Sequence, residues 1–220
     1  MKKNYEKEKR QQEITRAGNP RKPQGEEGVQ MLQRMNRSHF ELTDWALRYL
    51  ELEDGDQVLD IGCGGGAALK NMSERIASGH LTGVDYSEVS VRLSKETNAE
   101  DIKRDKMEIL GASVEKLPFR DERFDKIITV ESFYFWPDPE ENLKEVFRVL
   151  KKGGAFLLVA DIYQKEGLKA DVLETVKEYH LLNPTREEFG EMFRQAGFQN
   201  IEIHTKESED WICVLGKRAT

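Results

Sequence analysis

The sequence has few cysteines, no long apolar run and no spaced set of metal ligands. Its two cysteines, Cys63 and Cys213, lie far apart in the chain, which fits a reducing compartment and argues against a zinc site built from cysteines. The four histidines show no ligand spacing, so we expect no metal. No run of about 18 apolar residues occurs, and the first residues lack the apolar segment of a signal peptide. We therefore expect a soluble, cytoplasmic protein without an integral membrane segment.

The charge is acidic overall and unevenly distributed. The 220 residues carry a net charge of −7, with 38% apolar and 34% charged residues, enough for one well-packed core. Residues 1–25 hold eight lysines and arginines against three glutamates, so the rest of the chain is more acidic still. An acidic body argues against nucleic acid as a partner, because such binding neutralises phosphates with basic side chains. We expect the basic arm to be a solvated, partly disordered leader.

Apolar periodicity predicts two N-terminal helices followed by alternating strands and helices. Gly55 ends the helical section and Ser87 is expected to cap a helix, while the pair at 153–154 is expected to stop the helix whose apolar stripe spans 143–150. Such alternation predicts an α/β fold with a largely parallel, doubly wound sheet. The expected helices are 27–37, 42–50, a helix from about 67, another after 87, 143–150, 167–181 and 185–196. The expected strands are 57–61, 81–85, 107–110, 126–131, 155–160, 200–204 and 211–215.

The most informative segment is residues 58–66, VLDIGCGGG, in which a buried strand runs into a glycine loop. Glycines at 62, 64, 65 and 66 permit positive φ angles and a close approach of the backbone to a ligand. A junction of this kind, opening a helix, is typical of nucleotide-like cofactor sites. Tight turns between a strand and a helix are also common without any ligand, so the motif alone leaves both interpretations open.

Polar residues follow the next two strands at the edge where open α/β sheets bind ligands. Asp85 ends the second strand, where its carboxylate is placed to accept hydrogen bonds from both hydroxyls of a ribose. Ser113 and Val114 follow the third strand. Together with the glycine loop, these residues predict a site for a cofactor that contains a nucleoside.

Asp60 helps to separate two cofactor classes that fit this pattern. Gly62, Gly64 and Ala67 formally satisfy the dinucleotide fingerprint, so NAD remains an alternative. A carboxylate two residues before the first glycine would repel a pyrophosphate and attract the cationic groups of S-adenosylmethionine. A carboxylate that only braces the loop or a helix dipole is the other interpretation.

These segments resemble the class I S-adenosylmethionine-dependent methyltransferases, in the small-molecule branch that includes the ubiquinone and menaquinone biosynthesis enzymes. The matching motifs are VLDIGCGGG at 58–66, GVDYS at 83–87, LPF at 117–119 followed by FD at 124–125, and LKKGG at 150–154. The resemblance spans residues 55–162, about half the chain, in the order and spacing of the family. It implies a Rossmann-like, doubly wound, seven-stranded sheet, mostly parallel with an antiparallel last strand. It also implies a basic arm and helical lid at 1–50 and a methyltransferase domain at 51–220.

The resemblance also assigns site residues. The glycine loop is expected to contact the methionine part of S-adenosylmethionine, Asp85 the ribose, and the pair at 113–114 the adenine. At position 113 the family usually has Asp or Asn, and the shorter hydroxyl of Ser113 is a departure from that pattern. The residues expected to bind the cofactor, and its product S-adenosylhomocysteine, are Asp60, Gly62, Cys63, Gly64, Asp85, Tyr86, Ser113, Val114 and Glu131.

The segment 131–138, ESFYFWPD, follows the fourth strand and is rich in aromatic residues. Tyr134 and Trp136 are candidate walls for the methyl acceptor, either as a cage for a cation or as a pocket for a flat phenol. Methyl transfer needs alignment of donor and acceptor more than a nucleophilic residue. If a base is needed, the candidates are His39, Glu131 and Tyr163.

Three functions remain in competition at this point. The sequence favours an enzyme that transfers a methyl group from S-adenosylmethionine to a small-molecule acceptor, whose reacting atom is undetermined. A binding protein that keeps the cofactor fold without turnover is the second interpretation, and an NAD-dependent oxidoreductase is less favoured. Methylation of nucleic acid is disfavoured by the acidic body and by the absence of an Asn/Asp-Pro-Pro-Tyr motif after the fourth strand.

Overall fold

A central sheet of seven strands organises the protein, and the computed structural model describes residues 2–220. The strands are β1 (Gln57–Ile61), β2 (His80–Asp85), β3 (Met107–Gly111), β4 (Phe124–Val130), β5 (Leu150–Ala160), β6 (Gln199–Thr205) and β7 (Ile212–Lys217). The helices are α1 (Lys2–Gly18), α2 (Gly25–Ser38), α3 (Phe40–Ala46), α4 (Ala67–Ser73), α5 (Glu88–Thr97), α6 (Ala99–Lys103), α7 (Pro139–Val149), α8 (Ala170–Glu178) and α9 (Arg186–Gln195), with a short 3-10 turn at Phe133–Phe135.

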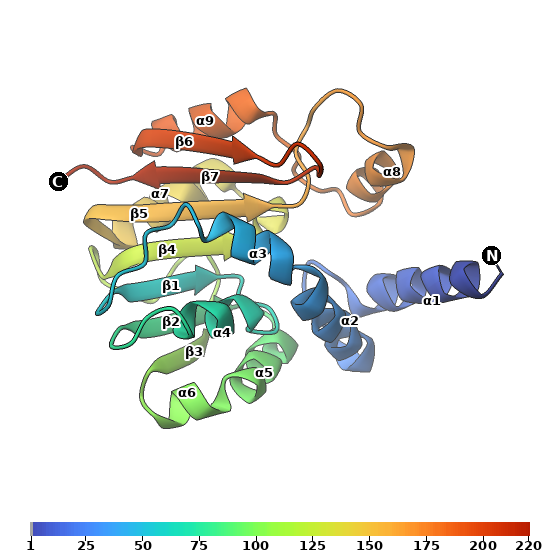
Figure 1. Cartoon of the computed structure of the whole chain (residues 1–220), viewed down its shortest axis with the longest axis horizontal. Helices are drawn as coiled ribbons and strands as arrows, with labels where there is room; N and C mark the ends of the chain where they lie inside the picture. Colours follow the sequence, from blue (N-terminus) through green and yellow to red (C-terminus); the bar gives the residue numbers. More distant parts are fainter. Residues whose placement is uncertain (1) are drawn as a thin grey trace.

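The strand order is β3-β2-β1-β4-β5-β7-β6. From β1 the chain adds β2 and β3 on one side, and it then crosses back to add β4 and β5 on the other side of β1. The pairs β1–β2, β2–β3, β1–β4 and β4–β5 are parallel, whereas β7 runs antiparallel to both of its neighbours. This arrangement confirms the predicted doubly wound, mostly parallel sheet. The parallel strands of the cyan-to-yellow half of Figure 1 all point toward the side where α1 and α2 lie, so their carboxyl ends share one edge.

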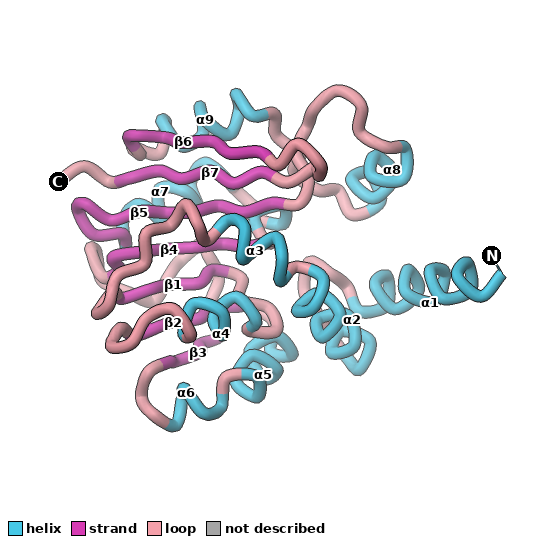
Figure 2. The backbone as a smooth tube through the Cα atoms, in the orientation of Figure 1, coloured by secondary structure: helices cyan, strands magenta, loops and turns pink. Residues whose placement is uncertain are grey.

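Helices cover both faces of the sheet and create two apolar cores (Figure 2). Ile127 of β4 is buried in the core on the side of α7 and α9, and Ile128 is buried in the core on the side of α3 and α4. Both side chains are fully buried, which is the pattern expected for a strand covered on both faces. The continuous β-branched run at 127–130 is therefore explained by the central place of β4 in the sheet.

The helix α7 ends earlier than predicted, and β5 begins earlier. The helix stops at Val149, and β5 starts at Leu150, so the pair at 153–154 lies inside a strand and not at a helix end. Gly153 has φ +75°, and the pairing between β4 and β5 shifts register in this region. A glycine with positive φ occurs at strand bulges as well as at helix ends, so the glycine pair does not by itself distinguish the two. The prediction of a helix end at this pair is therefore wrong. Lys151 forms an ion pair with Asp125 at 2.8 Å instead of facing a helix end.

The basic N-terminal arm differs from the expected leader, because most of it is the helix α1. Arg16 near the end of α1 forms an ion pair of 2.7 Å with Glu178 of α8. Figure 1 shows α1 projecting from the body next to α2, at the carboxyl edge of the sheet. Within residues 2–220, no helix combines the length and the apolar character that crossing a membrane requires.

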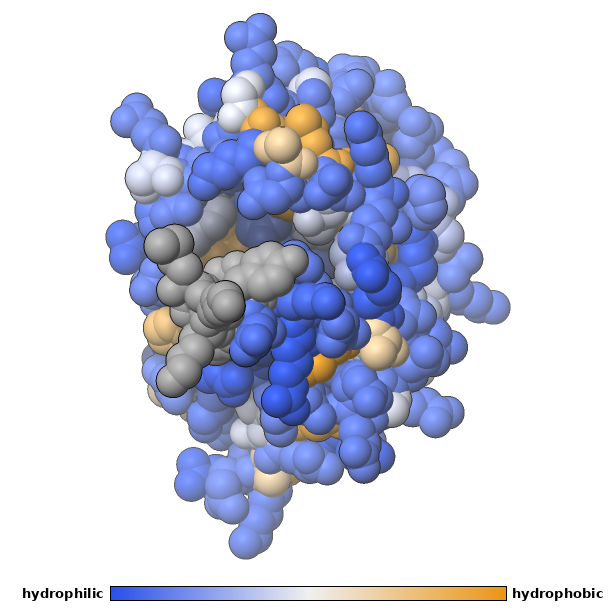
Figure 3. Space-filling model, turned by 90° about the vertical axis from the view of Figure 1, so that its right-hand side faces the viewer, coloured by the Kyte–Doolittle hydropathy of each residue, from blue (hydrophilic) through white to orange (hydrophobic). Residues whose placement is uncertain are grey.

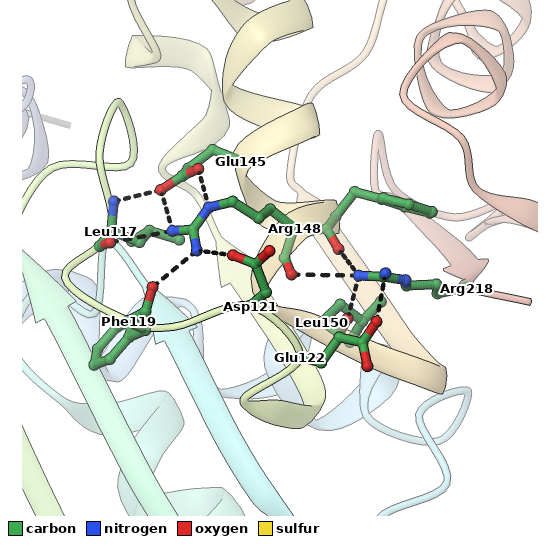
Figure 4. Close-up of polar contacts among 9 residues, drawn as sticks. Leu117, Phe119, Asp121, Glu122, Glu145, Arg148, Leu150 and Arg218 are labelled. Carbon is green, nitrogen blue, oxygen red and sulfur yellow. Dashed lines mark hydrogen bonds and ion pairs between the residues drawn. The ribbon is translucent and has the colours of Figure 1, made fainter. Parts of the chain in front are cut away.

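Arg148 fastens the segment at 117–119 to α7 (Figure 4). Arg148 donates to the carbonyl oxygen of Phe119 at 2.8 Å and to the carboxylates of Asp121 and Glu145 at 2.7 Å. Glu145 in turn accepts the Leu117 N–H at 2.8 Å. The predicted LPF motif is therefore part of a structural clamp that holds the connection between β3 and β4.

Candidate active site

A cavity of about 380 Å³ opens at the carboxyl edge of the sheet, beneath α2 and α3. It is lined by the ends of β1, β2 and β4, by the glycine loop after β1 and by residues of the three helices α2, α3 and α4. Its volume falls within the range of about 300–1,000 Å³ that is usual for small-molecule sites. Figure 3 views the molecule from this end, where the surface is largely hydrophilic with small hydrophobic patches. The cavity thus lies where a doubly wound sheet binds its ligand.

The glycine loop is held tightly against its neighbours. The N–H groups of Gly62 and Cys63 both donate to the Val84 carbonyl oxygen, at 2.8 and 3.0 Å. Gly62 has φ +73°, and a Cβ atom there would lie 2.4 Å from the Cβ and Oγ atoms of Ser132. Only glycine permits this contact between the loops after β1 and β4. Gly62, Cys63 and Gly64 all line the cavity.

Asp85 lines the cavity and also organises the loops around it. Its Oδ2 atom accepts the Gly64 N–H at 3.0 Å, and its Oδ1 atom accepts the Ser87 N–H at 2.9 Å. Burial raises the pKa of Asp85, and the two backbone N–H bonds act in the opposite direction. Tyr86 also lines the cavity, and its hydroxyl donates to the Arg21 carbonyl oxygen.

Ser113 and Val114 line the cavity after β3, where the sequence placed them. The Ser113 hydroxyl donates to the Glu115 carboxylate at 2.9 Å and accepts the Glu115 N–H at 3.3 Å. The Ser113 hydroxyl, which departs from the family pattern, is therefore hydrogen-bonded within its own loop. Val114 is buried, with 7% of its surface exposed.

Asp60 lies beneath the glycine loop and is not among the residues that line the cavity. It is 1% exposed, and neither of its carboxylate oxygens has a hydrogen-bond partner among the described residues. Burial, and then the charge of Asp85, raise the pKa of Asp60 to about 8. Because a carboxyl with this pKa is largely protonated at pH 7, it repels a pyrophosphate less than a charged aspartate would.

Four residues form a polar cluster beside the cavity: His39, Glu131, Tyr134 and Asp161. The Tyr134 hydroxyl lies 3.0 Å from Glu131 Oε1 and 3.0 Å from Asp161 Oδ1, and it accepts the Asp161 N–H at 2.9 Å. The Nε2 atom of His39, at the junction of α2 and α3, lies 4.0 Å from Glu131 Oε2. Asp161 follows β5 directly, as Glu131 follows β4.

Burial is the largest cause of the pKa shifts in this cluster. It raises the pKa of Glu131 well above its usual value, and the nearby charge of Asp161 adds to the shift. Burial lowers the pKa of His39, an effect that Asp161 opposes and Arg34 reinforces. At pH 7 the imidazole is therefore neutral with a lone pair available. Glu131 also has φ +57°, a left-handed backbone that is rare outside glycine and concentrates at functional sites.

The remaining candidates differ in whether they line the cavity. Trp136 lines it, and its indole N–H donates to Ser132 Oγ at 3.4 Å. Tyr134 is 5% exposed and supports Glu131 and Asp161 from behind without lining the cavity. Tyr163 packs on the core with Lys165 above its ring, and it does not line the cavity either.

Sequence reasoning missed two parts of the site. Asp161 is absent from the predicted set, although it lies at the carboxyl end of a strand, as Asp85 and Glu131 do. The linker between α1 and α2 is absent from the predicted site, yet its residues Pro20 and Arg21 line the cavity. Arg21 lies over the Phe135 ring at 5.3 Å, and the Pro23 carbonyl oxygen accepts the Ser87 hydroxyl at 2.6 Å.

Comparison with known proteins gives matches to methyltransferases. Residues 59–158 match the family described as a methyltransferase domain. The chain is 27% identical over 183 residues to the uncharacterised methyltransferase YdaC of Bacillus subtilis, covering 80% of this chain and 91% of that protein. It is 28% identical over 172 residues to a chloroplastic 2-methyl-6-phytyl-1,4-hydroquinone methyltransferase of Oryza sativa, covering 77% of this chain and 50% of the relative.

Solved structures agree with these sequence matches at the level of the fold. The structure of an S-adenosylmethionine-dependent methyltransferase from Aquifex aeolicus superposes with a TM-score of 0.70 at 20% identity, covering 84% of this chain and 95% of that chain. The chain spans about half the length of the plant relative, so the plant enzyme's substrate does not transfer by this match alone. The fold, the ordered motifs and the family match over residues 59–158 agree, and together they support a class I S-adenosylmethionine-dependent methyltransferase.

Proposed function

We propose that the protein transfers a methyl group from S-adenosylmethionine to a small-molecule acceptor bound in the cavity beneath α2 and α3. One observation carries the proposal. A single cavity is lined both by the glycine loop with Asp85 and by His39 with Glu131. The first set suits a cofactor, and the second offers polar groups to an acceptor, with Glu131 proposed to contact both ligands.

The residues present fit the cofactor. Gly64 lines the cavity with φ +50°, so the backbone approaches a ligand without an intervening side chain. The Asp85 carboxylate keeps lone pairs for ribose hydroxyls beyond its two backbone bonds. The residues that we propose to hold the cofactor from the cavity wall are Gly62, Cys63, Gly64, Asp85, Tyr86, Ser113, Val114 and Glu131. Asp60 lies behind the glycine loop and does not line the cavity.

The cofactor, when bound, supplies a methyl group on a sulfonium. The chain's own contribution is to bind, to orient and to exclude water. Met35, Phe40, Phe135 and Trp136 give the acceptor side apolar surface, and the linker at 20–23 closes the mouth. We propose that residues 1–50 act as a lid on the domain at 51–220. Tyr163 has no place in this mechanism, because it lies away from the cavity.

The acceptor class follows from the same lining. A mixed aromatic and acidic wall suits a small organic molecule, and the relative from Oryza sativa is named for a hydroquinone. The acidic charge of the body supports a small molecule over nucleic acid.

A screen with methyl-labelled S-adenosylmethionine tests the proposal. Phenols, hydroquinones, amines and thiols are offered as acceptors, and label is followed into the low-mass fraction. Label in a small molecule supports the proposal. Tight binding of S-adenosylhomocysteine with no transfer to any class supports a binding protein without turnover, and binding of NAD without S-adenosylhomocysteine contradicts the cofactor assignment.

A further inference from the structure

Three side chains from separate segments converge at the acceptor side of the cavity. One ligand atom each from His39, Glu131 and Asp161 can be chosen so that all three lie within 4.8 Å of one another. They come from the junction of α2 and α3 and from the ends of β4 and β5. Neighbouring ligand atoms around a divalent ion are separated by about 3 Å in cis and 4 Å in trans, given metal–ligand bonds of about 2.1 Å. Small movements of these side chains would bring all three ligand atoms within bonding distance of one ion.

The carboxylates of Glu131 and Asp161 lack a basic partner. No lysine or arginine among the described residues forms an ion pair with either of them, and His39 lies 4.0 Å from Glu131. Two carboxylates this close repel each other unless a cation or a proton lies between them. The ion pairs that the described residues do form, such as Lys151 with Asp125, place a basic group directly on the acid.

One oxygen of each carboxylate is held and the other is left free. Glu131 Oε1 accepts the Asp161 N–H and faces the Tyr134 hydroxyl, which also lies 3.0 Å from Asp161 Oδ1. No described group donates to Glu131 Oε2 or to Asp161 Oδ2. Tyr134 is itself fixed by the N–H groups of Asp161 and Ile162, at 2.9 and 3.2 Å. Ligands of metal ions are typically oriented by outer hydrogen bonds of this kind.

The donor set indicates the kind of ion. A neutral imidazole suits first-row transition ions, carboxylates suit harder ions such as Mn²⁺, and one imidazole with two carboxylates leaves coordination positions open. We propose that His39, Glu131 and Asp161 bind a divalent transition ion, with Mn²⁺ and Zn²⁺ as the best candidates. The open positions face the cavity, because His39 and Glu131 line it.

The ion would serve acceptors that bear an ionisable oxygen, such as a phenol or hydroquinone. This role rests on the proposed function, whereas the binding of the ion does not. A bound divalent ion would favour the deprotonated form of an oxygen ligand, whose proton would pass to solvent, so the ion would replace a protein base at this position. In that arrangement the His39 imidazole is a ligand, and its lone pair is not available to accept a proton.

Titration of the full-length protein with MnCl2, followed by electron paramagnetic resonance, tests the site. We expect one Mn²⁺ per chain and spin-echo modulation from a coordinated nitrogen. His39→Ala should remove the nitrogen modulation and weaken binding at least tenfold, and Asp161→Asn should weaken binding by a similar factor. His204→Ala is the matched control, because it removes a half-buried histidine that pairs with Glu202 at 3.3 Å and does not line the cavity. Its Mn²⁺ affinity should equal that of the wild type.

Two further variants separate this site from its surroundings. Tyr134→Phe removes an outer hydrogen bond and leaves all three ligands, so Mn²⁺ affinity should fall by about 10–100-fold. Asp85→Ala should weaken S-adenosylhomocysteine binding and leave Mn²⁺ binding unchanged, while His39→Ala should do the reverse. Equal Mn²⁺ affinity of the wild type and both ligand variants overturns the proposal, as does the absence of nitrogen modulation. A protein that binds Mn²⁺ as expected but transfers no methyl group would contradict the proposed function alone.

Discussion

The carboxylate of Asp85 accepts the backbone N–H of Gly64 at 3.0 Å, which ties the loop after β1 to the end of β2. The same side chain holds the start of α5 through the Ser87 N–H. Asp85 is therefore both a cavity wall and the brace of the glycine loop.

Asp85→Ala should weaken S-adenosylhomocysteine binding by about 1.5–3 kcal/mol, the range for hydrogen bonds to a charged group. Isothermal calorimetry measures the change directly. Asp85→Asn keeps the shape and one acceptor oxygen, so its loss should be smaller. Arg92→Ala on α5 is the control, because Arg92 is exposed and lies outside the cavity. A dissociation constant that is unchanged in Asp85→Ala would refute the ribose role.

Gly62→Ala should destabilise the fold by about 2–4 kcal/mol. The new Cβ would meet Ser132 at 2.4 Å, and φ is +73°; strain in the left-handed region adds about 1–2 kcal/mol to the cost of overpacking. Urea unfolding measures the difference. Gly55→Ala shares a positive φ without any atom within 4 Å, so it should show the backbone strain alone. Equal losses in the two variants would contradict the close contact between the loops.

Asp60→Asn should change how stability depends on pH. The folded-state pKa of Asp60 is about 8, above the value of about 3.9 in an unfolded chain. Unfolding therefore releases a proton between these values, and stability falls as pH rises, by about 1.4 kcal/mol per pH unit, becoming constant above the folded pKa. In Asp60→Asn this carboxyl is absent, so the stability of the variant lacks the pH-dependent contribution of Asp60.

The difference between the two proteins isolates Asp60, because the other titrating groups are common to both. Urea unfolding without cofactor at pH of about 5.5 and 7.5 should show the wild type losing about 2–3 kcal/mol relative to Asp60→Asn. Parallel stability curves for the two proteins would indicate that Asp60 is ionised in the folded state.

Arg148→Met should destabilise the protein by about 2–3 kcal/mol, because its carboxylate partners and the Leu117 and Phe119 carbonyl oxygens lose their donors. Arg194→Met is the matched control. Arg194 pairs with Glu191 at 59% side-chain exposure, and such surface pairs contribute about 0–1 kcal/mol. Thermal unfolding of both variants measures the contrast, and similar losses would show that the clamp in Figure 4 adds nothing to stability.

Most of the sheet was predictable from local signals. The bounds of the strand at 57–61 were predicted correctly, because a run this short between Gly55 and Gly62 favours a strand over a helix. The N-cap role of Ser87 was also correct, since its Oγ accepts the Ser90 N–H at 3.2 Å. The start of β5 was wrong, because a glycine with positive φ serves a strand bulge and a helix stop equally well.

The candidate site was predictable where residues follow strands, and less so elsewhere. Asp85 and Glu131 were found from their positions after β2 and β4. The partnership of His39 with Glu131 and Asp161 joins three segments that are distant in sequence, and no local pattern contains that information. The placement of the linker beside the cavity likewise depends on contacts of Tyr86 and Ser87 made only in the folded chain.

The most direct test of the central claim is a single-turnover experiment with methyl-labelled S-adenosylmethionine and the acceptor panel. The account predicts label in a small-molecule product with the wild type, and transfer at least tenfold slower with Asp85→Ala at limiting cofactor. The contradicting result is tight binding of S-adenosylhomocysteine by the wild type with no label in any low-mass product.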